Sequence, residues 1–172
     1  MRTIAPVLLS AALLLVWADP ARAQPSSPRP APTLEGQAGL AAFVDDAAVR
    51  HEVVGASARY YLSRRVAIGP ELLYLVGPGS DRDLIATGNI TFDLRAPARR
   101  GAVPYLVAGA GLFQHSDAFN GVTFTSREGA WTGGAGIRAW VSDRAYVAGE
   151  YRVGWELHHR ASIHVGVGLG PR

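Results

Sequence analysis

Residues 54–72 read VGASARYYLSRRVAIGPEL, and this stretch contains the pattern that decides the fold. Up to the short polar step at 63–65, side chains alternate in character, so that Val54 and Tyr60 share one face while Arg59 lies on the other. Residues two apart lie on the same face of a β-strand, and this period predicts strands rather than helices. The stretch therefore predicts a strand, a tight three-residue turn and a second strand.

The same pattern returns 79 residues later, in GGAGIRAWVSDRAYVAGEY at residues 133–151. The matched positions are Gly55 and Gly134, Arg59 and Arg138, Ser63 and Ser142, and Glu71 and Glu150. Self-similarity at a fixed spacing indicates a repeated structural unit. The repeat predicts a duplicated β-hairpin, as expected of a sheet built from successive hairpins.

From residue 34 onward, the chain divides into eight segments with strand-like alternation, separated by turn clusters. The predicted strands are 34–44, 49–62, 66–76, 83–94, 102–114, 126–141, 145–157 and 160–169. The predicted connections are 45–48, 63–65, 77–82, 95–101, 115–125, 142–144 and a tight turn near 158–159. A tilted strand needs about 9–11 residues to cross a membrane, whereas strands of soluble sheets average about five or six. The segment lengths therefore favour a membrane barrel.

The two faces of these strands differ in a way that predicts which one meets lipid. On one face, the positions from Val54 to Leu62 and their equivalents in the other strands, such as Leu72, Ile137 and Val165, carry no charge, whereas the other face mixes glycine, hydroxyls, aromatic rings and charges such as Arg59 and Glu150. Repeated glycine weakens an exposed strand, but it makes room inside an eight-stranded barrel, whose interior is just wide enough for side chains. We therefore predict an all-β fold, an eight-stranded antiparallel up-and-down transmembrane β-barrel with its apolar face toward lipid.

The charges of the mixed face suggest an internal network. In each copy of the repeat an arginine precedes the turn and a glutamate follows it, which predicts that Arg59 faces Glu71 and Arg138 faces Glu150, with Arg152 and Glu156 extending the second set. A buried arginine is tolerated when it is paired with a carboxylate. We expect these six residues to form a salt-bridge ladder that plugs the lumen. The alternative is that they are rim charges in water, where such pairs contribute about 0–1 kcal/mol each.

The N-terminal residues have the features of an export signal. Arg2 precedes an apolar run from Ile4 to Trp17, and Ala21-Arg22-Ala23 matches the small-x-small cleavage pattern. The run is short for a membrane anchor helix, which needs about 20 apolar residues. We predict a cleaved signal peptide at residues 1–23, a Pro-rich disordered linker at 24–33 and an outer-membrane β-barrel domain at 34–172.

The composition excludes several classes of function. The chain has no cysteine, which excludes disulfides, thiolate metal sites and lipid attachment at a cysteine. Its formal net charge is +3, which is too even a balance to indicate nucleic-acid binding. No phosphate-binding loop, zinc spacing or nucleophile elbow is present, so we expect no cofactor.

The signal, the Pro-rich start, the repeated hairpin and the glycine-rich strand Pro104-Tyr105-Leu106-Val107-Ala108-Gly109-Ala110-Gly111 together resemble the OmpA/OmpX-like family of small eight-stranded outer-membrane barrels. The resemblance covers about residues 34–170 and implies that both termini lie in the periplasm. It also implies that the connections at 45–48, 77–82, 115–125 and 158–159 face outward. Family members usually end in an aromatic residue that the barrel-assembly machinery recognises, whereas this chain ends Gly168-Leu169-Gly170-Pro171-Arg172.

For function, the sequence favours a non-enzymatic outer-membrane protein that serves as a structural anchor or as a surface-loop interaction protein. The longest connection supplies the candidate contact residues His115, Asp117, Phe119 and Asn120, because loops on rigid scaffolds often carry function. We expect contacts with outer-membrane lipid and, during biogenesis, with the assembly machinery; we also expect a monomer that binds no nucleic acid.

The sequence leaves three alternatives open. A lipid-modifying enzyme would need a nucleophile with a base and an orienting group, for which His115-Ser116-Asp117 and the group Glu156, His158, His159 and Ser162 are candidates; the adjacent histidines could also bind a metal. A narrow ion pore is a second alternative, although eight strands leave no wide channel. A secreted, soluble lipocalin-like barrel is the third.

Overall fold

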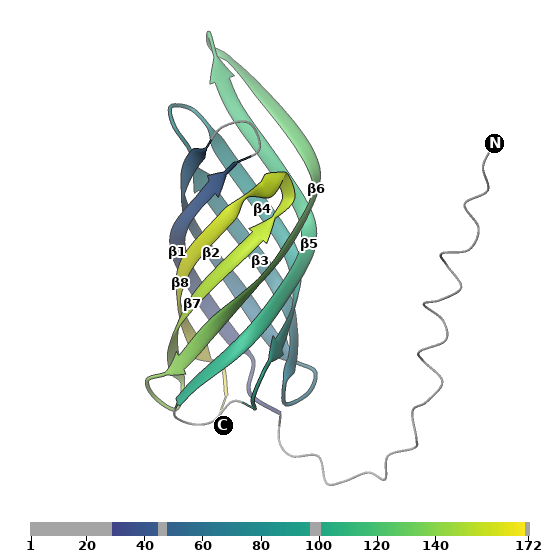
Figure 1. The fold of residues 1–172 in the computed structure, drawn as a ribbon, viewed down its shortest axis with the longest axis vertical. Helices are drawn as coiled ribbons and strands as arrows, with labels where there is room; N and C mark the ends of the chain where they lie inside the picture. Colours follow the sequence, from purple (N-terminus) through teal and green to yellow (C-terminus); the bar gives the residue numbers. More distant parts are fainter. Residues whose placement is uncertain (1–28, 45–47, 97–100, 171–172) are drawn as a thin grey trace, which may run out of the picture.

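The structure, a computed structural model, describes residues 29–44, 48–96 and 101–170. They form a closed antiparallel barrel of eight strands (Figure 1). The strands are β1 (Thr33–Phe43), β2 (Val49–Tyr61), β3 (Val66–Val76), β4 (Arg82–Asp93), β5 (Gly101–Phe119), β6 (Val122–Trp140), β7 (Ala145–Gly154) and β8 (His159–Gly168), with a 3₁₀ turn, η1 (Trp155–Leu157), between the last two. The predicted signal peptide lies outside the described residues, as do residues 24–28 of the predicted linker.

Each strand pairs with its neighbours in sequence, and β1 pairs with β8 to close the barrel. The predicted number of strands and their up-and-down order are confirmed. The start of β1 and the end of β8 lie at the same end of the barrel, and the β5–β6 hairpin rises beyond the other strands at the opposite end (Figure 1). We call the end with the hairpin the mouth and the other end the base.

Two predicted boundaries are wrong. The connection predicted at 115–125 is mostly strand, because β5 continues to Phe119 and β6 begins at Val122. Only Asn120 and Gly121 turn the chain, both with positive φ, as a two-residue hairpin of this kind requires. The prediction for the seventh strand runs too far: β7 ends at Gly154, and the turn falls at 155–158 rather than at 158–159.

Pro70 lies in the middle of β3, a position where a proline needs a structural reason. It lacks the N–H that a strand donates to its neighbour. On one side, β3 pairs with β4 continuously, with Pro70 opposite Gly88. On the other side, the pairing with β2 stops after Glu71 and resumes at Ile68. The proline is accommodated by this local gap in the β2–β3 ladder.

The duplicated hairpin has the same turn chemistry in both copies. The Ser63 hydroxyl accepts hydrogen bonds from the backbone N–H groups of Arg65 and Val66, at 3.3 and 3.1 Å. The Ser142 hydroxyl accepts the equivalent bonds from Arg144 and Ala145, at 3.3 and 2.9 Å. Serine can satisfy backbone donors of a tight turn in this way, and this explains why a serine opens both three-residue turns.

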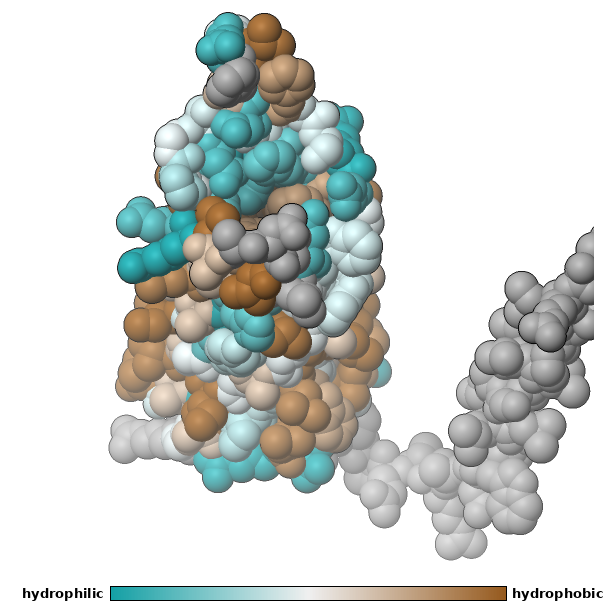
Figure 2. Space-filling view, turned by 45° about the horizontal axis from the view of Figure 1, so that its top comes forward, coloured by the Kyte–Doolittle hydropathy of each residue, from teal (hydrophilic) through white to brown (hydrophobic). Residues whose placement is uncertain are grey.

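Large apolar side chains cover the outer wall. Leu72, Ile137 and Val165 are all exposed, whereas Arg59 and Glu150 are buried inside. Figure 2 shows hydrophobic residues around the wall and hydrophilic residues gathered toward the mouth. Among the described residues, no helix has the length and apolar character needed to cross a bilayer. A soluble lipocalin-like barrel would bury its apolar face and expose its charges, so this alternative is wrong.

Glycines inside the barrel stand beside large rings, as the sequence predicts for a narrow tube. A Cβ added to Gly136 would lie 2.5 Å from the ring of Tyr105, and one added to Gly166 would collide with the ring of Tyr146. In a close-packed interior an added methyl group has nowhere to go without moving its neighbours. These glycines therefore let the tyrosines cross the lumen.

Candidate functional site

Glu71 on β3 pairs with two arginines across the barrel. Its carboxylate oxygens lie 2.9 Å from Arg152 Nη1 on β7 and 2.7 Å from Arg160 Nη2 on β8. Gln37 and Asn89 donate side-chain hydrogen bonds to the same carboxylate. One buried group thus connects five strands around the circumference.

Glu150 on β7 is a second junction of buried groups. Its Oε1 lies 2.6 Å from Arg152 Nε, and the hydroxyl of Tyr105 donates to its Oε2 at 2.9 Å. Arg160 Nη2 and Arg59 Nη2 lie farther from the carboxylate, at 3.5 and 3.9 Å. Glu150 therefore connects Arg59 with Arg152 and Arg160, the two arginines that also bind Glu71.

Glu35 on β1 joins the network from the strand that closes the barrel. Its Oε1 lies 3.0 Å from Arg59 Nε, and its Oε2 lies 3.1 Å from His164 Nδ1. The other ring nitrogen of His164 hydrogen-bonds with the Ser162 hydroxyl at 2.9 Å. The seam between β1 and β8 is thus connected by side chains as well as by its ladder.

Arg138 on β6 lies nearer the base and is completely buried. Its Nη1 lies 3.5 Å from Asp93 Oδ2 and donates to the Tyr61 hydroxyl at 2.7 Å, and that hydroxyl donates to Asp93. The guanidinium also lies 5.1 Å from the ring centroids of both Tyr105 and Tyr146. Cation–π contacts of this kind strengthen when they are desolvated, and they help to hold a charge in the lumen.

We call these groups the lumen network. Its members are Glu35, Arg59, Glu71, Asp93, Arg138, Glu150, Arg152, Arg160 and His164, and all are buried. The four carboxylates balance the four guanidinium groups. Buried charges are costly unless they are paired and hydrogen-bonded. Each of the four guanidinium groups has a carboxylate oxygen within 3.5 Å, whereas several of their nitrogen atoms, such as Arg138 Nη2 and Arg160 Nη1, have no hydrogen-bond partner among the described residues.

The pairs predicted from sequence are not the pairs that form. Arg59 binds Glu35 rather than Glu71, and Arg138 binds Asp93 rather than Glu150. The prediction paired side chains within one hairpin, whereas long side chains in a narrow tube reach partners on other strands. Five of the six predicted residues point into the lumen. Glu156 does not join them, because it lies in η1 at the mouth with a φ of 54°.

Glu35, Arg160 and His164 were not among the predicted ladder residues, although the sequence carried a signal for them. All three have the inward parity of their strands: β1 buries its odd-numbered positions from Thr33 to Gln37, and β8 buries even-numbered positions from Arg160 to His164. Following the alternation through the first and last strands would have placed them inside.

Two clusters of buried apolar side chains share the lumen with the network. Toward the mouth, the buried cluster consists of Ala41, Phe43, Val53, Leu73, Leu75, Ile85, Phe113 and Ala130. Toward the base, it consists of Val103, Trp140, Tyr146 and Ala148, with the rings of Trp140 and Tyr146 4.6 Å apart. Arg138 is paired with Val103 and Ala148 in the ladders of β6, so the charged groups nearest the base lie level with the second cluster. Charged and apolar side chains together fill the lumen.

The predicted surface loop is a protruding β-hairpin. Asp117 hydrogen-bonds with the Ser80 hydroxyl at 2.6 Å and with its neighbour's backbone N–H at 2.7 Å, and these bonds lower the pKa of its carboxyl group. Asn120 forms the turn, and Phe119 ends β5. Among the described residues, β6 pairs with β7 only from Thr132 onward, so its edge has no strand partner above that point.

His115 has a different environment from the rest of the hairpin. Its Nδ1 lies 2.8 Å from Asp83 Oδ1 and 3.4 Å from Asp81 Oδ1. On the other side of these carboxylates, His51 Nε2 lies 2.8 Å from Asp81 Oδ2 and 3.2 Å from Asp83 Oδ2. We call these four residues the mouth cluster. Only His115 among them was singled out from sequence.

The candidate catalytic groups do not assemble at an accessible site. Ser116 alternates with His115 and Asp117 along β5, so its side chain lies on the opposite face, where it contacts Thr125. Ser162 does bond His164, which bonds Glu35, but all three are buried in the lumen.

The adjacent histidines His158 and His159 also diverge. His158 is buried against Phe43 and hydrogen-bonds with the carbonyl of Trp155, whereas His159 contacts the hydroxyl of Tyr151 on the outer surface. The two rings therefore do not form the metal site that their adjacency suggested.

Comparison with known proteins identifies the family. A family model described as "Outer membrane protein beta-barrel domain" matches residues 9–170. This chain belongs to the outer-membrane β-barrel protein family. Its location is accordingly the outer membrane, and the apolar outer wall is the surface that lipid contacts. No curated protein matches the chain.

Solved structures of outer-membrane barrels share the fold at low sequence identity. Neisserial surface protein A is 13% identical with a TM-score of 0.71, and covers 80% of this chain and 97% of its own. The N-terminal barrel domain of Pseudomonas aeruginosa OprF is 14% identical with a TM-score of 0.64, and covers 81% and 97%. Ail, the attachment invasion locus protein of Yersinia pestis, is 12% identical with a TM-score of 0.53, and covers 82% and 98%.

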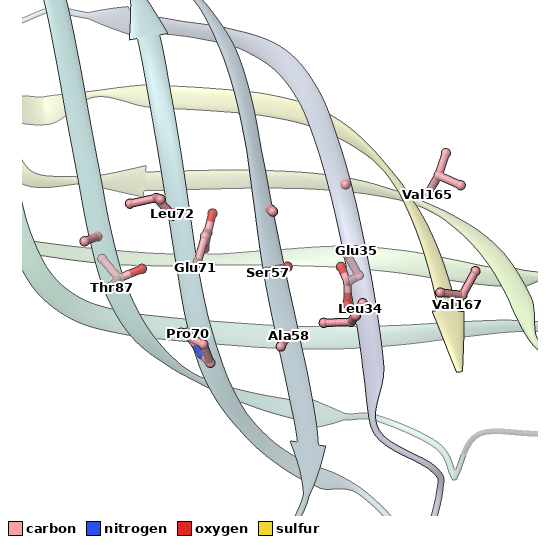
Figure 3. A pocket seen from close by; sticks show the side chains of 13 residues that line it. Leu34, Glu35, Ser57, Ala58, Pro70, Glu71, Leu72, Thr87, Val165 and Val167 are labelled. Atoms are coloured by element: carbon pink, nitrogen blue, oxygen red, sulfur yellow. The ribbon is translucent and has the colours of Figure 1, made fainter. Parts of the chain in front are cut away.

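The lipid-facing wall of this outer-membrane barrel has a shallow hollow across β1, β2 and β3 (Figure 3). Small residues such as Ala56 and Ala58 form its floor, and Leu34, Leu72 and Val165 stand around it. Glu35 and Glu71 belong to the same strands but are buried inside. The hollow is an apolar surface that acyl chains can fill, and it is separate from the lumen network.

Proposed function

We propose that this protein is a non-enzymatic anchor that holds the β5–β6 hairpin at the cell surface as a contact element. The observation that carries the proposal is the combination of a sealed barrel with a single hairpin that continues well beyond its neighbours (Figure 1). A rigid scaffold that presents an exposed segment is a common arrangement for recognition.

The closed lumen argues against transport. The lumen network and the two apolar clusters fill the interior with buried side chains. Eight-stranded barrels are just wide enough for such filling. We expect purified protein to give no conductance steps in planar bilayers, and steady single-channel currents from the wild-type protein would contradict the sealed lumen.

The hairpin offers two features that suit a protein contact. Within the described part of the chain, β6 forms no ladder with β7 from Val122 to Trp131, and η1 contacts this edge at Glu128, which accepts a hydrogen bond from Trp155 Nε1. The unpaired edge nearer the tip can accept a strand from a partner. Val122 and Phe124 are also exposed near the tip. By the alternation of β6, both lie on the face that continues the lumen side, whereas Thr123 and Thr125 continue the lipid-facing side.

Two of the structural relatives carry names that agree with this proposal. One is a neisserial surface protein, and another is an attachment invasion locus protein. Their sequence identity to this chain establishes the shared fold alone. They support the proposal only as examples of the same barrel used at a bacterial surface.

The orientation can be tested with single cysteines, because the chain has none of its own. Thr123→Cys places a thiol near the tip of the hairpin, and Asp143→Cys places one in the short turn before β7 at the base. We expect a membrane-impermeant maleimide to label Thr123→Cys on intact cells and Asp143→Cys only after the outer membrane is opened. The reverse pattern would contradict the proposal.

The contact role needs a variant that removes the hairpin and spares the barrel. Replacing residues 117–124 with Asn-Gly leaves Ser116 and Thr125, which already pair, at the ends of a two-residue turn.

A photo-crosslinking side chain at Phe124 of the otherwise intact protein should capture a specific partner on living cells. The same side chain at Asp143 is the control. Equal crosslinking from both positions, or none from any exposed hairpin position, would contradict a contact role.

The hydrogen-bonded series Ser162, His164 and Glu35 resembles the nucleophile, base and orienting group of a hydrolase. Each of the three residues is at least nine-tenths buried, and Arg59 pairs with the same glutamate. A substrate would have to displace the apolar clusters to reach the hydroxyl. We therefore interpret the series as part of the lumen network, and we expect a fluorophosphonate probe to leave Ser162 unlabelled in the folded barrel.

A further inference from the structure

We propose that the mouth cluster, His51, Asp81, Asp83 and His115, binds a divalent transition-metal ion of the zinc class. The residues come from β2, the β3–β4 connection, β4 and β5, and none of them belongs to the lumen network. A ligand atom from each of His51, Asp81 and Asp83 can be chosen so that all lie within 4.8 Å of one another. His115 approaches both carboxylates from the opposite side.

The spacing of the donor atoms is close to that of a metal shell. Zinc–nitrogen and zinc–oxygen bonds of about 2.0–2.2 Å in a tetrahedron place neighbouring ligand atoms about 3.3 Å apart. In the mouth cluster, the two longer contacts are 3.2 and 3.4 Å, and the two shorter contacts are both 2.8 Å. His51 contacts the Oδ2 atoms of the two carboxylates and His115 contacts their Oδ1 atoms, so of these four residues only His51, Asp81 and Asp83 bring donor atoms within 4.8 Å of one another. These three residues form the preformed part of the shell, and the ring of His115 must move toward them to supply a fourth donor.

The chemistry of the donors selects the class of ion. Imidazole nitrogen suits zinc and other late transition metals, whereas calcium and magnesium prefer shells of oxygen alone. The two carboxylates, Asp81 and Asp83, lie together between the two rings and contribute negative charge in a partly buried place. A doubly charged cation at this point would neutralise both.

The donor atoms of the mouth cluster border a small cavity. A cavity of about 150 Å³ opens at the cluster, and its floor contains Phe43 and Phe113 of the apolar cluster toward the mouth. The ring of Phe43 packs edge-on against His51 with centroids 4.9 Å apart. Gly77 has no side chain where one would collide with Asp81 Oδ2 and His51 Nε2. The absence of a side chain at Gly77 therefore leaves space beside the donor atoms of Asp81 and His51.

An ion bound here would join the base of the hairpin to the rest of the mouth. His115 lies on β5 where the hairpin begins, opposite Asp83 in the β4–β5 ladder. His51 lies on β2, across the mouth from it. The expected consequence is a hairpin that is held more rigidly when metal is bound.

The test uses the folded full-length barrel in detergent, freed of metal with a chelator and titrated with Zn²⁺ in competition with a chromophoric chelator. We expect one Zn²⁺ per barrel. Asp83→Asn and His115→Ala should each weaken binding at least about tenfold, a loss at the lower end of what metal sites show when even a supporting residue is removed. Gly77→Ala keeps all four donors and should weaken binding by occupying their space.

His159→Ala is the matched control, because His159 lies on the outer surface against Tyr151 and outside the cluster. It should bind Zn²⁺ as the wild type does, and heat-modifiable gel migration should show that every variant is folded. X-ray absorption of the zinc complex should report two nitrogen and two oxygen ligands. The proposal is overturned if the folded wild type binds no stoichiometric Zn²⁺, or if Asp83→Asn and His115→Ala bind it unchanged; preference for Ca²⁺ over Zn²⁺ would also overturn it.

Discussion

At the scale of single residues, the stability of the lumen depends on matched charges. Glu71 is the clearest case, because Arg152 and Arg160 both lie within 3 Å of it and both are buried. Removing one partner of a buried pair leaves an uncompensated charge. The loss of folding free energy is then larger than the stabilisation that the intact pair gives relative to an apolar interior.

We predict that Glu71→Gln destabilises the folded barrel by about 3 kcal/mol or more, in line with the 3–5 kcal/mol typical of broken buried ion pairs. The amide keeps the shape of the side chain and some of its hydrogen bonds, so the loss reports the charge. Urea unfolding in lipid vesicles measures it. Glu52→Gln is the control at an exposed position of β2, where a change within about 0.5 kcal/mol is expected; equal effects at both positions would contradict the role of the lumen network.

Glycine positions inside the wall give a second prediction. In Gly136→Ala the new methyl group would lie 2.5 Å from the Tyr105 ring and 2.7 Å from the carbonyl oxygen of Gly149. Overpacking of this kind costs about 1–3 kcal/mol. Gly149→Ala provides the comparison, because no atom lies within 4 Å of its added methyl group. Free energies of unfolding should fall for the first variant only, and a loss of similar size in both would show that packing is not the cause.

The parity of each residue was predictable from sequence, but its partner was not. Alternation placed Arg59, Glu71, Arg138, Glu150 and Arg152 inside, because one buried face fixes the register of a strand. Which carboxylate meets which arginine depends on the stagger and tilt of a closed barrel. Those quantities are set by all eight strands together, so a pattern read within one hairpin does not contain them.

At the scale of elements, the β5–β6 hairpin combines a spanning part with a free part. The lower part of β6 pairs with both neighbours, whereas residues 122–131 pair only with β5. The sequence carried a signal for this hairpin in Asn120-Gly121, a strong two-residue turn signal. Its polar neighbours made residues 115–125 look like a loop, because the free part of a hairpin has no buried face to reveal its alternation.

We predict that replacing residues 117–124 with Asn-Gly changes the free energy of unfolding by less than about 1 kcal/mol, because residues 122–129 of β6 are exposed and surface changes of this kind are usually small. Heat-modifiable migration and urea unfolding measure the effect. Replacing the turn at 142–144 with Gly-Gly-Gly is the contrast, since it removes the Ser142 bonds at 3.3 and 2.9 Å. A collapse of stability in the truncated protein alone would mean that the hairpin is part of the folding core.

At the scale of the whole molecule, the barrel is a filled lumen inside an apolar wall. The lumen network and two buried apolar clusters fill the interior, and the wall outside them exposes large apolar side chains. Only closed barrels and helices satisfy every backbone polar group in lipid. The sequence predicted the apolar wall because side chains alternate between the two faces through all eight strands. It did not predict the buried apolar clusters, because the inward face was expected to mix glycine, hydroxyls, aromatic rings and charges along its whole length.

The location of the termini and the assembly route are also questions about the whole molecule. The described chain begins and ends at the base, where Leu169 donates a backbone hydrogen bond to Pro32. The expectations of a monomer and of contact with the barrel-assembly machinery during biogenesis stay predictions. They concern partners rather than the fold.

In the folded barrel, lipid should touch the outer wall while the lumen side chains are shielded from it, and two native tryptophans allow a test. Trp131 faces outward and is 51% exposed, whereas Trp140 lies in the lumen near the base and is 7% exposed. Two variants of the signal-free protein, each retaining one of these tryptophans with the others replaced by phenylalanine, would be folded into vesicles containing brominated phosphatidylcholine. We expect strong quenching of Trp131 fluorescence and little quenching of Trp140. Strong quenching of Trp140 with an insensitive Trp131 would contradict this expectation.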